Sequence, residues 1–496
     1  MKQAYFLGID NGGTMSKAAV YDACGRELSV ASCRVQQLVP RAGWSERDME
    51  SLWMDTASVI RQATVQAGIE PSQIQGIACT GHGNGLYLLD RRGKPLRRGI
   101  NSSDERAQSY IDNWHSQHVD EQVLPKTAQS IWAAQPAPLL AWLRDNEPDV
   151  FRNTGTVLMV KDYIRYRLTG ERRAEITDMS GTGLMNVVDE TYDAAVLEAY
   201  GVPEIMPWLP PLVESAETAG YISAEAASLT GLRQGTPVAG GMFDIDACAL
   251  SSGILNPGQF SIVAGTWGNN QYIDRQPLVD KDLFMTSRYV IPGWYLMLEG
   301  SPTSAGNLEW FLETFFAHER MDFGEGFYGH IAGMVSQTEP ADSQTVFLPF
   351  LYGCNSGNLK GGFFGLEAAH GRGEMLRAIF EGIVFSHYQH IERLLKFRAF
   401  PEVIRLTGGA ARNPVWCQMF ADCIGIPVET PAGSELGALG AAMAASVATK
   451  YYSDFTQAVN AMTAIDKRYS PNPEYTAVYR KKYQAYRELI CRLNKT

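Results

Sequence analysis

The chain has 496 residues, 45% of them apolar and 20% charged, with a formal net charge of −11. This length and composition predict a globular protein of two or three domains, and the acidic balance excludes nucleic acid or an anionic membrane as the main partner, because both require a basic surface. No apolar run reaches the about 18 residues of a membrane span, and eight dispersed cysteines without a CxxC pair indicate free thiols in a reducing cytoplasm.

The first half of the chain alternates predicted strands and helices, which is the pattern of an α/β fold. The strands are expected at 5–10, 17–21, 28–34, 74–79 and 236–241, and the helices at 50–68, 133–146, 161–169 and 245–252. The first turn, between residues 10 and 17, contains the glycine pair Gly12 and Gly13.

The segment 255–258 is typical of a linker, and a second strand–turn–strand unit follows it at 260–273. This unit repeats the pattern of 6–21 about one domain later, which predicts two related domains, 1–254 and 255–496. A strand at 403–406 then precedes a helix at 414–424, and the tail from 454 to 494 is expected to be largely helical.

The first glycine turn is a candidate phosphate site. Gly12 and Gly13 allow backbone N–H groups to approach an anion, and Thr14 adds a hydroxyl donor. Asp10 could hold Mg²⁺ through water. The alternative is an ordinary hairpin turn whose Asp bonds its own backbone, and Lys17 is either a phosphate contact or a solvated strand residue.

Two glycine segments of the second half are candidates for the same ligand. Gly265 and Thr266 form the second turn, again with a plain hairpin as the alternative. The loop 408–413 lies between a strand and a helix, so its backbone could contact a nucleotide base, or its small residues could serve packing alone. Its candidate nucleotide contacts are Gly408, Gly409, Ala410 and Asn413.

An acid at a strand-to-helix corner is the candidate general base. Asp244 follows a Gly-Gly pair and could accept a proton from a bound hydroxyl. The alternatives are that Asp244 is only a helix N-cap, or that Asp246 in the first helical turn is the base.

Two polar loops of the first half carry the amide, imidazole, carboxylate and guanidinium groups that bind sugar hydroxyls. The candidates are His82, Gly83, Asn84, Asp104 and Arg106. Each loop could instead be an ordinary surface loop. The spacing of the eight histidines does not indicate a metal site.

Taken together, these motifs resemble the FGGY family of carbohydrate kinases over almost the whole chain. The opening strand and turn at 9–14, the GWSERD segment at 43–48, the glycine-bounded segment 361–382, the loop 408–413 and the stretch 435–442 follow in family order. A single motif of this kind would be weak, but five in order are specific.

The resemblance implies an α/β fold of two ribonuclease-H-like domains, of the actin-like and hexokinase type, with an interdomain cleft. Residues 1–254 would bind a small sugar and 255–496 would bind ATP, with Asp244 as catalytic base and Mg²⁺ on Asp10. A homodimer is a further family-level expectation.

Within the family, the segments 81–90, 301–311 and 347–357 resemble those of members that act on a ketopentose, and this resemblance implies a substrate such as L-xylulose, phosphorylated at a terminal hydroxyl. Another pentulose, a polyol or a hexulose stays open, because Ile245 stands where pentulose kinases often have Asn or Gln. An actin-like ATPase without a sugar acceptor and a non-catalytic sugar sensor are the alternatives from other classes.

Overall fold

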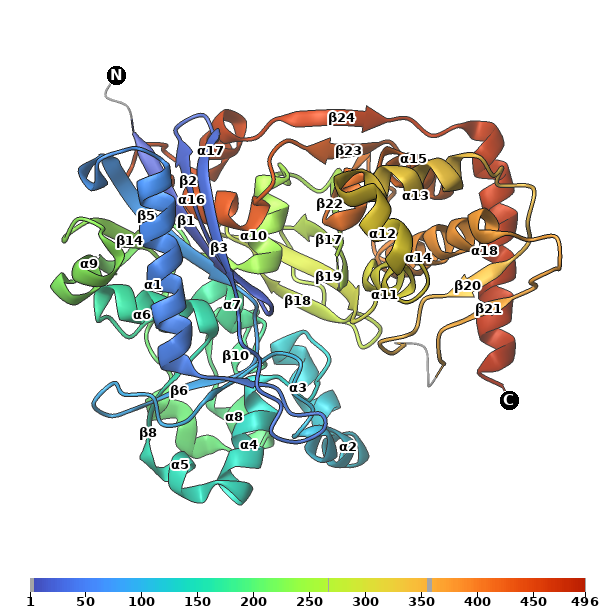
Figure 1. Cartoon of the computed structure of the whole chain (residues 1–496). Helices are drawn as coiled ribbons and strands as arrows, with labels where there is room; N and C mark the ends of the chain where they lie inside the picture. The colour runs from blue at the N-terminus through green and yellow to red at the C-terminus, as the bar shows by residue number, and fades with distance from the viewer. Residues whose placement is uncertain (1–3, 266, 355–358, 496) are drawn as a thin grey trace. The chain divides into compact units, whose positions relative to one another are not determined.

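A computed structural model of the chain describes residues 4–265, 267–354 and 359–495 (Figure 1). The chain forms two compact units. Unit 1 comprises Met1–Gly253, Asp274–Met297 and Gly433–Ala464, and unit 2 comprises Ile254–Ile273, Leu298–Ala432 and Ile465–Thr496. None of the helices in the described ranges combines the length and the apolar character that a membrane crossing requires.

A mixed sheet forms the centre of unit 1, with the strand order β13-β14-β5-β1-β2-β3 and with β15 paired to β5. The strands are β1 (Tyr5–Asn11), β2 (Met15–Asp22), β3 (Glu27–Arg34), β5 (Ile74–Gly81), β13 (Thr218–Tyr221), β14 (Pro237–Ala239) and β15 (Met242–Phe243). β1 is antiparallel to β2 and parallel to β5, and its residues from Tyr5 to Ile9 are buried, as expected of a central strand.

Several helices pack on this sheet or beside it. α1 (Met49–Gln66) begins at its N-cap Asp48, whose side chain accepts from Ser51 N, and packs against β2 and β3. α16 (Leu436–Ala448) packs against β1 and β5, where Gly8 has no room for a side chain, since a Cβ there would lie 1.8 Å from Ala438 O. α10 (Asp244–Ser251) packs against α16.

The remaining elements of unit 1 are mostly short, and some of them surround a second hydrophobic core built between Leu86 and Ile205. They include β4 (Glu46–Arg47), β6 (Tyr87–Asp90), β7 (Gly99–Ile100), α2 (Gln108–Ser116), α3 (Val119–Thr127), α4 (Pro136–Asn146), α5 (Pro148–Asn153), β8 (Thr154–Leu158), α6 (Val160–Thr169), β9 (Ala174–Glu175), α7 (Ile176–Ser180), β10 (Met185–Asn186), β11 (Thr191–Tyr192), α8 (Ala194–Ala199), β12 (Leu212–Val213), α9 (Ala224–Thr230), β18 (Met285–Arg288) and α17 (Phe455–Met462). α6 and α7 pass close to the strand ends that carry the candidate site.

Unit 2 has its own mixed sheet, in which strands run in the order β19-β17-β16-β22-β23-β24. They are β16 (Gln259–Ala264), β17 (Gly268–Asp274), β19 (Tyr295–Ser301), β22 (Val403–Thr407), β23 (Val428–Pro431) and β24 (Ile465–Tyr469). The other elements are the hairpin β20 (Val346–Leu348) and β21 (Gly362–Phe364), and the helices α11 (Gly306–Phe315), α12 (Ala317–Phe323), α13 (Phe327–Ser336), α14 (Arg372–Leu394), α15 (Pro414–Ile424) and α18 (Pro473–Leu493).

The tail differs from its prediction in one element. Helices α17 and α18 are present, but Ile465–Tyr469 forms β24, antiparallel to β23 at the edge of the sheet. Its sequence IDKRY is exposed and rich in charge, as edge strands often are, so it lacks the apolar alternation by which a strand is recognised. The tail is therefore largely helical, as predicted, with these five residues as the exception.

Candidate active site

The first glycine turn connects β1 to β2. It is closed by the Gly12 N–H, which donates to Met15 O at 3.0 Å, while Gly13 and Thr14 are exposed. Behind the turn, the buried Arg47 donates to Gly13 O at 3.2 Å and to Asn101 Oδ1. Because the guanidinium binds carbonyl oxygens of the turn, the exposed side of the turn is left to N–H groups and the Thr14 hydroxyl, which suits an anion.

Asp10 lies at the end of β1 and is partly exposed. Burial raises the pKa of Asp10 to about 6; Lys17 lowers it and Glu435 raises it. The first turn of α16 comes so close that a Cβ on Gly437 would lie 2.6 Å from Asp10 Oδ2. Lys17 is not a solvated strand residue, since its Nζ pairs with Glu435 Oε2 at 2.7 Å.

Asp244 is the first residue of α10 and is not its N-cap, because Phe243 occupies that position. Its side chain is partly exposed, and burial raises its pKa well above the ordinary range, with the negative charges of Asp10 and Asp178 adding to the shift. Asp246 is fully buried and has a raised pKa for the same main reason. Of the two acids, therefore, Asp244 has the access that a base toward substrate requires.

The loop after β5 adjoins Asp244. A Cβ on Gly83 would lie 2.3 Å from the ring of Phe243, so only glycine fits there. Burial, with the nearby charge of Arg47, lowers the pKa of His82 to about 3, which makes its imidazole neutral. Asn84 is a buried residue with a left-handed φ of 62°, and within the described ranges its Oδ1 has no hydrogen-bond partner. A strained, unsatisfied amide of this kind is typical of a ligand contact.

Asp104 and Arg106 serve mainly each other. Asp104 accepts from Ser45 N at 2.7 Å and from Arg106 Nε at 2.8 Å. The Arg106 guanidinium also donates to Glu46 and lies 4.0 Å over the ring of Trp44. In the part of the chain that the structure describes, the buried Arg106 Nη1 has no hydrogen-bond partner.

A buried ionic cluster, which sequence reasoning missed, lies next to this loop. Lys161 Nζ lies 2.8 Å from Asp162, 3.4 Å from Glu175 and 3.3 Å from Asp178, and all four side chains are fully buried. Asp178 also faces the loop, since a Cβ on Gly83 would lie 3.0 Å from its Oδ1. Burial raises the pKa of Asp178, and Lys161 opposes the shift. Isolated acids spread over the sequence gave no signal for this cluster.

In unit 2, the two candidate nucleotide segments lie together. Gly408 has a φ of 83°, and a Cβ on it would lie 2.7 Å from Ala264 O and 3.0 Å from Gly265 N. Thr266 lies outside the described residues. Asn413 is the N-cap of α15, since its Oδ1 accepts from Val415 N at 3.0 Å and from Trp416 N at 3.3 Å. Its side-chain N–H₂ is therefore the group that remains for a ligand.

A second set of residues missing from the prediction supports this region. His387 on α14 lies between two side chains, with its Nε2 2.8 Å from Ser304 Oγ and its Nδ1 2.9 Å from Asn270 Oδ1. Burial lowers the pKa of His387 to about 3, so the ring is neutral. A Cβ on Gly268 would lie 3.0 Å from His387 Cε1, so the imidazole packs directly behind the end of the second turn.

The side chains that could bind a metal ion in this site are few, which suits Mg²⁺ better than a metal with many protein ligands. In the described ranges, no group of three or more His, Cys, Asp or Glu is arranged to hold a metal ion. Mg²⁺ commonly takes only one or two carboxylates together with water and substrate phosphates. The partly exposed Asp10, whose carboxylate accepts no hydrogen bond within those ranges, fits that role.

Comparisons with known proteins identify the family of the chain. The N-terminal domain of the FGGY family of carbohydrate kinases matches residues 5–251, and its C-terminal domain matches residues 260–449. The chain therefore belongs to this family: it is a carbohydrate kinase, a phosphotransferase that uses ATP to phosphorylate a small sugar.

Two named relatives and one solved structure show which carbohydrate kinases the chain is similar to. The chain is 40% identical over 494 residues to a probable L-xylulose kinase of Pasteurella multocida, with 99% of each chain covered. It is 40% identical over 492 residues to an L-xylulose/3-keto-L-gulonate kinase of Escherichia coli, with 99% of this chain and 97% of that one covered. A crystal structure of xylulose kinase from Rhodospirillum rubrum, 26% identical, has a TM-score of 0.89 and covers 99% of both chains.

Proposed function

We propose that the sugar is L-xylulose or a closely related keto sugar, phosphorylated at a terminal hydroxyl. The observation that carries this proposal is the 40% identity, over almost the full length, to two proteins named for L-xylulose. The unsatisfied Asn84 amide and the neutral His82 beside Asp244 support it, because an uncharged polyhydroxyl ligand needs both donors and acceptors.

Asp244 acts as the general base in this proposal. It accepts the proton of the attacking hydroxyl, and its raised pKa makes it a stronger base than an ordinary carboxylate. Asp178 is a positioning residue that acts on Asp244 through its charge. Gly83 allows the close approach of the loop to Phe243, and Asp104 with Arg106 hold the neighbouring loop, leaving Arg106 Nη1 as their contact to the sugar.

The phosphoryl donor is bound by backbone turns and a few side chains. In unit 1, Gly12, Gly13 and Thr14 receive phosphate oxygens, Lys17 adds positive charge, and Asp10 holds Mg²⁺ through water. In unit 2, the remaining contacts to ATP come from Gly265, Thr266, Gly408, Gly409, Ala410 and Asn413. Phosphoryl transfer depends mainly on such positioning and charge stabilisation, so the reaction needs no covalent bond to the protein.

A coupled assay of ADP release tests the proposal. The purified chain with Mg²⁺ and ATP is given L-xylulose, D-xylulose, L-ribulose, 3-keto-L-gulonate, xylitol, glycerol or no acceptor. We expect the highest kcat/KM with L-xylulose or 3-keto-L-gulonate over a low blank. A higher kcat/KM with another sugar would overturn the choice of substrate, and a blank as fast as every sugar would instead favour an actin-like ATPase.

A further inference from the structure

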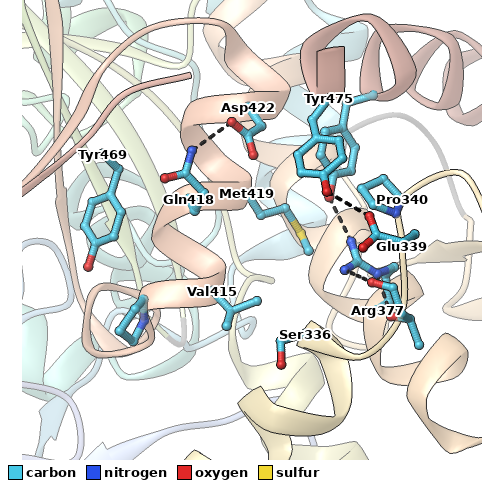
Figure 2. A pocket seen from close by; sticks show the side chains of 13 residues that line it. Ser336, Glu339, Pro340, Arg377, Val415, Gln418, Met419, Asp422, Tyr469 and Tyr475 are labelled. Carbon is cyan, nitrogen blue, oxygen red and sulfur yellow. Dashed lines mark hydrogen bonds between the residues drawn. The ribbon is translucent and has the colours of Figure 1, made fainter. Parts of the chain in front are cut away.

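A cavity of about 390 Å³ lies within unit 2, and none of the residues assigned above to sugar or ATP lines it (Figure 2). It is bounded by the end of α13, by α15 from Pro414 to Asp422, by the first turns of α18 and by the end of β24. Its volume is within the range of small-molecule pockets, roughly 300–1,000 Å³. Val415, Met419 and Pro340 give it apolar walls, and Tyr469 and Tyr475 add aromatic rings.

The positive charge that borders the cavity is satisfied by the protein. Arg377 Nε donates to Thr338 Oγ1 at 2.7 Å, Nη1 donates to Tyr479 OH at 2.9 Å, and Nη2 donates to Val335 O at 3.0 Å. Glu381 lies 3.6 Å from the same guanidinium. Since each nitrogen has a partner, Arg377 does not provide the site that a phosphate or a carboxylate would need.

The acceptors that border the cavity are not all satisfied. Asp422 is 3% exposed, and its Oδ1 accepts from Gln418 Nε2 at 2.8 Å and from Asn472 N at 2.7 Å. Within the described ranges no hydrogen bond reaches Oδ2, which points toward the cavity (Figure 2). Oδ2 is open to solvent in the cavity, so a ligand that donates a hydrogen bond there would replace water at this oxygen.

Glu339, on the loop after α13, provides a second acceptor. Its Oε2 accepts from Tyr475 OH at 2.8 Å, and this bond turns the carboxylate toward the cavity (Figure 2). Within the part of the chain that the structure describes, Oε1 accepts no hydrogen bond. The two carboxylates come from different elements, and the apolar side chains of Val415 and Met419 line the same space.

We propose that this cavity is a second ligand site, which binds a small organic cation with an ammonium group at each end of an aliphatic chain. Each ammonium provides only hydrogen-bond donors, which match the free oxygens of Asp422 and Glu339. The aliphatic chain packs on Val415 and Met419, and the ring of Tyr475 favours a nearby cation. Nucleotides and sugar phosphates are disfavoured, because the negative charge of both carboxylates would repel them.

Isothermal titration of the full chain with 1,4-diaminobutane tests the site, with 1,4-butanediol as the neutral analogue. We expect one site with a Kd of about 0.1–1 mM, because Glu339 is exposed and screened by solvent. The diol should give no saturable heat. Equal binding of the diol, or no saturable heat from the diamine up to about ten times that Kd, would overturn the proposal.

Variants separate a specific site from a general attraction of cations to an acidic protein. Glu339→Gln and Asp422→Asn should each weaken diamine binding at least about 5-fold, the loss of about 1 kcal/mol of charge-assisted hydrogen bonding. Asp466→Asn, which removes a charge from exposed β24 outside the cavity, should leave Kd unchanged. If all three variants bind like the wild type, or all three lose affinity equally, the cavity is not the site. Circular dichroism confirms the fold of each variant.

Discussion

Lys17 Nζ lies 2.7 Å from Glu435 Oε2, which joins β2 to the residue that precedes α16, 418 positions later in the chain. Both side chains are partly buried, so the pair is screened less than a surface salt bridge. We expect a double-mutant cycle of Lys17→Met and Glu435→Gln, measured by urea unfolding, to give a coupling free energy of about 0.5–1.5 kcal/mol. Additive single effects would show that the pair does not anchor α16.

Replacement of the proposed base should affect the chemical step. Asp244→Asn should lower kcat by about 10²–10⁴, the usual contribution of a general base, while the KM for ATP changes less than about 3-fold. Steady-state kinetics with the best sugar measures this. Asp246→Asn is the matched control, because Asp246 lies on the same helix but is fully buried, and it should keep kcat within about 10-fold. A reversed order of the two effects would move the role of base to Asp246.

The negative charge of Asp178 raises the pKa of Asp244. Removing that charge in Asp178→Asn favours the ionised form of Asp244, so Asp244 stays deprotonated to lower pH. The acidic limb of log(kcat/KM) against pH should therefore move down by about 0.5–1 unit. Glu225→Gln, an exposed acid on α9, should leave the limb in place. A limb that stays fixed or moves upward in Asp178→Asn would contradict the positioning role.

Replacement of Asp10 should stabilise the fold and abolish activity. Its folded pKa of about 6 lies above the unfolded value of 3.8, so the folded state binds the proton more tightly. Ionised Asp10 therefore destabilises the fold, and this effect grows between about pH 4 and pH 6 and is complete above pH 6. Asp10→Asn should therefore lose activity but unfold at a higher urea concentration at pH 7.5. We expect its free energy of unfolding to rise by about 1–2 kcal/mol, after allowance for the partial exposure of Asp10. At pH 4 the two proteins should differ little.

Gly408 should be intolerant of a side chain. In Gly408→Ala, the Cβ would meet Ala264 O at 2.7 Å, so the loop would move away from the second turn. We expect the KM for ATP to rise at least about 10-fold, from contacts worth more than about 1.4 kcal/mol. Gly324 also has a positive φ, but a Cβ there would meet open space. Gly324→Ala therefore shows the effect of backbone strain without the clash. Equal effects in both variants would show that the close approach is not needed for ATP.

The sequence predicted best those features that depend on local pattern. Strand β1, helix α1 and the glycine turn could be predicted because burial, capping and turn chemistry are each encoded within about ten neighbouring residues. The role of Gly408 as a loop glycine that could contact a nucleotide could be predicted for the same reason. Its contact with Ala264, 144 positions earlier, could not, because the parallel pairing of β16 with β22 is a long-range property.

The missed residues share one physical property. Arg47 and Asp178 are buried charged residues that contact Gly13 and Lys161, which lie far from them in the sequence, and such contacts leave no periodic signal. Asp104 and Arg106 illustrate the converse: their short motif was visible, but the structure shows that most of their polar atoms bind each other and Glu46 rather than remaining free.

The order in which the chain is made has a consequence for how unit 1 forms. α16 packs against β1 and β5, but it comes almost 360 residues after the end of β5. During synthesis from the N-terminus, this face of the sheet therefore stays uncovered until residues 436–448 have left the ribosome. At a synthesis rate of about 5–20 residues per second, that interval lasts roughly 20–70 seconds, during which Phe6, Ala78 and their neighbours on this face are open to chaperones. A truncation before Gly433 should therefore yield an aggregating chain rather than a smaller sugar-binding protein.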